Sequence, residues 1–284
     1  MRRNLLLVIL SLLIGTLLGA SYSEELRELA ESGDSVAQND LGLCYEDGEG
    51  VDPDPEEALY WYRLSAEEGY VLGQFNLARC YFHGIGTEED YSEAFHWFSL
   101  AAPQGHDNAQ NYLGVCYEKG YGVDIDFQEA VRWYRLSADQ GNKWAQNNLG
   151  TCYHNGHGVD VDYEAALAFY HLSADQDYYL AQYNIGICYE NGKGVEQDYG
   201  QAFEWYSLSA EQGYGEAMNA LGICYEYGQG VETDLEQAYI WYYLAYLFES
   251  ADGEANMSYL AMEFTEEEIV DLEGQADAWL AERW

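Results

Sequence analysis

Basic residues are scarce in this 284-residue chain, which has 11 Lys and Arg against 51 Asp and Glu and a formal net charge of −40. Proteins that bind nucleic acid neutralise phosphates with clustered Lys and Arg, and anionic membranes attract basic segments. Neither kind of partner fits this composition. The chain is not a disordered acidic tail, because 48% of its residues are hydrophobic and such a chain buries a core.

A long apolar run is also missing. The mostly apolar stretch Leu5–Leu18 is shorter than the roughly 20 residues that span a bilayer. Arg2 and Arg3 precede it and small residues follow at 19–21, which predicts a secretory signal peptide over residues 1–20. We expect an exported protein, periplasmic or secreted, with no stable membrane insertion after cleavage. The alternative is an uncleaved N-terminal anchor, with the rest of the chain on the exported side.

Catalytic signatures are missing as well. None of the three lysines, at 119, 143 and 193, follows a serine by three residues, and nucleophile-elbow, zincin and P-loop patterns do not occur. His154 and His157 share a loop but lack the ligand set of a zinc site. Pairs such as Asp124 and Asp126 lack the rest of a calcium loop. We therefore expect no catalysis, no metal and no cofactor.

The chain contains a 36-residue repeat, present six times without insertion between residues 37 and 252. A Leu/Ile-Gly/Ala-x-Cys-Tyr run begins at residues 41, 77, 113, 149, 185 and 221. A Gly-x-Gly motif follows, then an Asp at 54, 90, 126, 162, 198 and 234, an Ala and an aromatic pair. A period of this length, repeated in phase, indicates a solenoid of stacked units.

The first repeat shows how one unit folds. Its apolar residues over 37–45 have helical spacing, and Gly48 is expected to end this helix in the left-handed conformation. Asp54 is expected to cap a second helix that carries Trp61 and Tyr62. One such hairpin cannot cover its own apolar face, so neighbouring units must stack against it.

The pattern Ala-x3-Leu-Gly-x2-Tyr, Gly-x-Gly-Val, Asp-x3-Ala and Trp-Tyr resembles the Sel1-like repeat (SLR), a relative of the tetratricopeptide repeat (TPR). The resemblance implies an all-α chain, a right-handed α/α superhelix that serves as an adaptor or scaffold for other proteins. Some Cys-rich relatives are associated with β-lactam hydrolysis. An exported hydrolase acting on a β-lactam or cell-wall substrate is therefore the alternative function, and a structural envelope protein is a third. The departures from the pattern are Ala78, Thr87, Phe169, Asp177, Tyr246 and Glu249.

Both ends of the repeat array are expected to carry caps with polar outer faces. Residues 21–36 predict half a repeat, with one helix over 24–32. Residues 253–284 predict a C-terminal capping region, in which Thr265 and Glu268 form the capping box of a helix that continues to Trp284.

The six cysteines occupy the same position of successive repeats. Packed helices lie about 8–10 Å apart, whereas a disulfide needs Cα atoms roughly 4.4–6.8 Å apart. We therefore expect buried thiols and no bridges.

Similarity to TPR proteins places the first helix of each unit on a concave, partner-binding face. Amides on this face are expected to bond to an extended peptide, although they would equally well join neighbouring repeats or face water. Trp, Tyr and Arg are frequent binding hot spots, and Arg79 is expected to anchor a partner carboxylate. The predicted partner is a neutral or basic protein or peptide, attracted by the acidic surface. The candidate residues are Asn39, Phe75, Arg79, Phe82, Asn111, Trp144, Asn147, His154, Tyr183 and Asn219.

Overall fold

The computed structural model describes residues 22–283, which form fifteen α-helices and two short 3-10 helices and contain no strand. The expected all-α fold is confirmed. The expected signal peptide, residues 1–20, lies outside the described residues. Within 22–283, no helix is both long and apolar enough to cross a bilayer.

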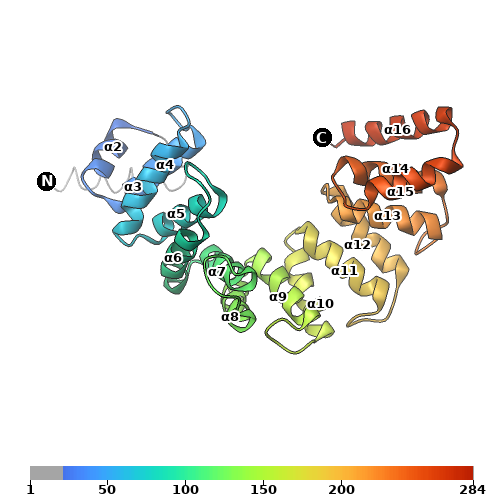
Figure 1. Cartoon of the computed structure of the whole chain (residues 1–284), viewed down its shortest axis with the longest axis horizontal. Helices are drawn as coiled ribbons and strands as arrows, with labels where there is room; N and C mark the ends of the chain where they lie inside the picture. The colour runs from blue at the N-terminus through green and yellow to red at the C-terminus, as the bar shows by residue number, and fades with distance from the viewer. Residues whose placement is uncertain (1–21, 284) are drawn as a thin grey trace, which may run out of the picture. The chain divides into compact units, whose positions relative to one another are not determined.

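The chain divides into two compact units, after Gln140 (Figure 1). The described helices of the first unit are α2 (Glu24–Glu31), α3 (Ser35–Asp47), α4 (Pro55–Glu67), α5 (Val71–His83), α6 (Tyr91–Ala101), η1 (Ala102–Gln104), α7 (Asp107–Lys119) and α8 (Phe127–Ala138). The second unit contains α9 (Lys143–Asn155), α10 (Tyr163–Ala174), α11 (Tyr179–Asn191), α12 (Tyr199–Glu211), α13 (Gly215–Tyr227), α14 (Leu235–Leu247), α15 (Gly253–Leu260), η2 (Ala261–Glu263) and α16 (Glu266–Ala281). The two helices of each repeat pack against each other as a hairpin.

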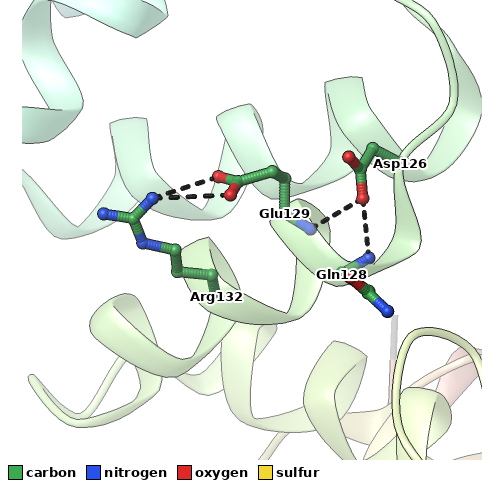
Figure 2. A network of polar contacts seen from close by, with 4 residues as sticks. All are labelled: Asp126, Gln128, Glu129 and Arg132. Atoms are coloured by element: carbon green, nitrogen blue, oxygen red, sulfur yellow. Dashed lines mark hydrogen bonds and ion pairs between the residues drawn. The ribbon is translucent and has the colours of Figure 1, made fainter.

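Each second helix begins at the predicted aspartate. In α8, Oδ1 of Asp126 accepts hydrogen bonds from the backbone amides of Gln128 and Glu129, each 3.0 Å long, as Figure 2 shows. Glu129 then pairs with Arg132 one turn further on, at 3.4 Å. An N-cap of this kind is worth about 1 kcal/mol. The six N-caps are Asp54, Asp90, Asp126, Asp162, Asp198 and Asp234, as predicted.

The ends of the first helices are also as predicted. Each ends at a glycine in the left-handed conformation, with φ between 64° and 76°, which side chains with a Cβ rarely adopt. These glycines are Gly48, Gly84, Gly120, Gly156, Gly192 and Gly228.

The core of each hairpin lies between a small residue and an aromatic ring. A Cβ on Gly114 would lie 2.6 Å from the ring of Tyr134, so only glycine permits this close approach. The six cysteines are buried beside these contacts and, within residues 22–283, form no disulfide, as expected. Burial raises the pKa of Cys80 and of Cys116 to about 12, so neither thiol is reactive at neutral pH.

Polar contacts that recur at fixed intervals hold the hairpins together. The hydroxyl of Ser65 donates to the carbonyl of Ser35, 30 residues earlier, at 2.6 Å. The same bond joins Ser137 to Asp107 at 2.8 Å, and further copies occur in the fourth and fifth repeats. Since it satisfies a fully buried serine hydroxyl of the second helix, it fixes how the second helix packs on the first.

Helices flank the repeats at both ends, and one of them was not expected. The N-terminal helix is α2, and Thr265 and Glu268 form the predicted capping box of α16. Helix α15 was not predicted. Its Asn256 donates to Asn219 at 2.8 Å, the bond that an asparagine of the next repeat makes elsewhere in the chain. Helix α15 is therefore the first helix of an incomplete seventh unit.

Candidate partner-binding surface

The asparagine track does not form an open surface. Asn39 is 1% exposed, and Asn147 and Asn219 are each 6% exposed. Each of these three amides accepts a hydrogen bond from an asparagine 37 residues later, at 2.8–2.9 Å. Asn111 is equally buried, at 7%. Asn39, Asn147 and Asn219 therefore lie between successive first helices, and the burial of all four asparagines corrects the expectation that they face a partner.

Aromatic residues interrupt this track at two positions. In α5, Phe75 stands where other repeats have the asparagine, and it stacks on His106 with ring centroids 4.4 Å apart. Tyr112 stands where the donor asparagine would be, 6.1 Å from the ring of Phe75. Both members of the amide pair are thus replaced by rings. In α11, Tyr183 packs against Tyr214 at 5.1 Å.

A second kind of polar pair is replaced in the second repeat, which contains α5. In four repeats, a buried tyrosine of the second helix donates its hydroxyl to a glutamate near the end of the first helix, at 2.6–3.0 Å. The second repeat has Phe98 in place of the tyrosine and Phe82 in place of the glutamate, with ring centroids 6.1 Å apart. The second repeat therefore lacks both the tyrosine hydroxyl that donates this hydrogen bond and the glutamate that accepts it. The four pairs are Tyr62–Glu46, Tyr134–Glu118, Tyr206–Glu190 and Tyr242–Glu226.

These two changes gather aromatic rings beside α5. The ring of Phe82 lies 5.2 Å from Tyr112 and 5.7 Å from Tyr121, in edge-to-face geometry. Phe75, Phe82, Tyr112 and Tyr121 are all half-buried, so each keeps part of its surface accessible. We call these four residues the α5 aromatic surface. Sequence reasoning missed Tyr112 and Tyr121, although both depart from the residues that other repeats have at their positions.

Arg79 lies one turn from both Phe75 and Phe82 on α5, but its charge is already paired. Its guanidinium forms an ion pair with Glu46 of the preceding repeat. Burial alone would raise the pKa of Glu46, but hydrogen bonds from Arg79 and Tyr62 outweigh it and lower that pKa. The expected anchor for a partner carboxylate thus already has a carboxylate partner within this chain.

The remaining candidates belong to the second unit. Trp144 is 44% exposed at the start of α9, with Nζ of Lys143 5.7 Å from its ring centroid. His154 lies at the other end of the same helix, half-buried, and its Nε2 is 3.1 Å from Nζ of Lys193. Among residues 22–283, no group of three His, Cys, Asp or Glu side chains is arranged to hold a metal ion.

Comparison with known proteins identifies the class of protein. The Sel1 repeat family matches residues 35–70, 71–106, 107–142, 145–178, 180–214 and 215–247. The fold is accordingly an α/α solenoid of SLR type, and the chain belongs to the Sel1 repeat family. No curated protein matches it.

Two solved structures are similar over most of this chain. A Sel1 repeat protein from Oxalobacter formigenes is 34% identical, with a TM-score of 0.71, over 75% of this chain and 85% of that one. A protective antigen of uropathogenic Escherichia coli strains, which displays an SLR fold, is 32% identical with a TM-score of 0.63. That match covers 92% of this chain, which spans only 64% of the length of the antigen.

Proposed function

We propose that this protein is an exported, non-catalytic adaptor that binds a neutral or basic protein segment at the α5 aromatic surface. Membership of the Sel1 repeat family supports a protein-interaction scaffold in general, and proteins built from this repeat are typically non-catalytic. The finer proposal concerns which surface binds and what kind of partner it takes.

The observation that carries the proposal is the coupled loss of two structural pairs in the second repeat. Asparagine pairs are found at three other places along the chain and tyrosine–glutamate pairs in four other repeats. Replacing both kinds of pair with aromatic rings, of which Phe75, Phe82 and Tyr112 are half-buried, removes satisfied polar bonds. Aromatic side chains supply large contact area at low conformational cost, and they are enriched in the centres of protein interfaces. Placing accessible aromatic surface where its neighbours have polar links favours a binding role.

Charge selects among possible partners. The net charge of −40 repels acidic proteins and accelerates encounter with neutral or basic ones. Around the α5 aromatic surface, the ion pair of Arg79 with Glu46 leaves no unpaired cation on α5 itself to attract an acidic segment.

The repeat itself supplies variants that test this surface. Phe75→Asn with Tyr112→Asn copies the pair Asn39–Asn76, and Phe82→Glu with Phe98→Tyr copies Glu46–Tyr62. Both double variants are expected to fold, because the same pairs exist in neighbouring repeats. A photo-crosslinking amino acid at position 121 should yield a specific adduct in cells producing the otherwise unchanged protein. Each double variant should reduce the yield at least tenfold.

A matched control is Tyr60→Ala, because Tyr60 is 52% exposed on α4 in the same unit and lies outside the α5 aromatic surface. It should leave the yield unchanged. Undiminished crosslinking in both double variants would refute this surface.

Export is tested separately. N-terminal sequencing of the protein from the exported fraction should give a sequence that begins shortly after residue 20. An intact Met1 there would favour the anchored alternative.

A further inference from the structure

Lys193 is a cation without a carboxylate partner in a strongly acidic protein. Among residues 22–283, no carboxylate oxygen lies within 4.0 Å of its ammonium, and the ion pairs found there use other basic residues. Its ammonium instead lies 3.1 Å from Nε2 of His154 and 5.2 Å from the ring centroid of Tyr163. Lys193 is half-buried, and an ammonium has three N–H donors, so with these partners it retains unused donor capacity.

The position of His154 normally belongs to a carboxylate. Glu46, Glu118, Glu190 and Glu226 occupy it in four repeats, and each accepts a hydrogen bond from a buried tyrosine. In the fourth repeat the tyrosine is retained as Tyr170, but its hydroxyl makes only a 3.3 Å contact with Thr151. A glutamate at 154 would accept hydrogen bonds from both Tyr170 and Lys193. We therefore expect the protein to be less stable with histidine at this position than with glutamate.

The histidine also leaves a polar atom unsatisfied. A lysine ammonium can only donate, so Nε2 of His154 accepts and the ring proton resides on Nδ1. That Nδ1 is buried and has no hydrogen-bond partner among the described residues. Burial, and secondly the charge of Lys193, lower the pKa of His154. A local rule that is broken without a structural gain is typical of a functional position.

The surrounding contacts fix the backbone from which the Lys193 side chain extends. The amide of Lys193 donates to the carbonyl of Cys188 at 2.9 Å. The next residue, Gly194, is pressed so closely against α10 that a Cβ would lie 2.3 Å from the carbonyl oxygen of Tyr163. The loop backbone at Lys193 is therefore held close to α10, and the ammonium reaches His154 at the end of α9.

We infer that Lys193, supported by His154 and Tyr163, is a binding site for a single carboxylate group of a protein partner. The ammonium donates to the carboxylate oxygens, His154 positions the ammonium, and the ring of Tyr163 forms one wall. The ligand supplies beside His154 the carboxylate that a glutamate provides at this position in four other repeats. This inference rests on the proposed adaptor function, because it names a chemical group that a protein partner supplies. A segment that carries one carboxylate can still be neutral or basic overall. Exposed charges of the protein more than about 10 Å from that carboxylate are largely screened by salt and do not prevent its binding.

Three short peptides test the site and distinguish the source of the carboxylate: acetyl-Ala-Gly with a free C-terminus, the same peptide amidated, and amidated acetyl-Ala-Glu. The measurement is the chemical shift of the backbone amides of residues 193 and 194 during titration. Saturable shifts are expected with at least one of the two carboxylate peptides and none with the amidated Ala-Gly. Equal shifts with all three peptides, or none with any, would overturn the inference.

Two variants complete the test. Lys193→Gln should weaken carboxylate binding at least tenfold and still fold, because Gln229 occupies the equivalent position of the sixth repeat. His154→Glu should abolish binding and raise the Tm, because the new carboxylate fills the site from within. Lys143→Gln, which changes another lysine of the same unit, should leave binding unchanged. Unaltered binding in Lys193→Gln would refute the site, and these probes do not involve the α5 aromatic surface, so the two proposals fail separately.

Discussion

Replacing Tyr134 by Phe removes a single oxygen atom from the centre of the third repeat. The side chain is fully buried, and its hydroxyl donates to Oε2 of Glu118 at 2.7 Å. A hydrogen bond to a charged group is worth about 1.5–3 kcal/mol, and the ring itself loses no apolar contact. We expect a corresponding decrease in the free energy of unfolding, equivalent to a lower Tm by about 3–10 °C.

Urea denaturation followed by circular dichroism measures this change, and Tyr259→Phe is its matched control. Tyr259 is 65% exposed, so its replacement should change the free energy of unfolding by less than about 0.5 kcal/mol. The double variant Tyr134→Phe with Glu118→Phe copies the second repeat and should cost less than the sum of the two single changes. A loss below about 0.5 kcal/mol for Tyr134→Phe, or strict additivity in the double variant, would refute the reasoning.

Three further predictions concern backbone strain, pH and salt. Asp177 has φ +55°, and the first three repeats have a glycine with free space around it at the equivalent position. Asp177→Gly should therefore stabilise the protein by about 0.5–1 kcal/mol in the same denaturation assay. The control Asp175→Gly, at φ −61°, should destabilise it. The pKa of Glu46 is lower in the folded than in the unfolded protein, so ionised Glu46 stabilises the fold above pH 4.5, and this stabilisation is lost as the pH falls through the folded pKa. Glu46→Gln should therefore flatten the curve of Tm against pH in this acid range. An unchanged slope would contradict the pairing with Arg79. Self-repulsion at −40 should make moderate NaCl raise the Tm, and a decrease would show that attractive pairs dominate.

The sequence by itself determined the repeat and the ends of its helices. The aspartate caps bond to amides two or three residues away, and the glycine caps depend on the conformation of one residue. Such local preferences are visible in any single copy of the repeat. Six copies in phase then make the stacking inevitable, since one hairpin cannot cover its own apolar face. The unbridged cysteines followed from the same period.

Only the tertiary structure decided which side chains are available to a partner. Asn39 and Arg79 are both polar residues on a first helix, and their patterns predicted exposure. Their partners, Asn76 and Glu46, lie 37 and 33 residues away and come into contact only when repeats stack. The same stacking brings Tyr112 to Phe75 and Lys193 to His154. Contacts across a repeat boundary depend on how side chains of different units meet, and a pattern within one unit does not contain that information.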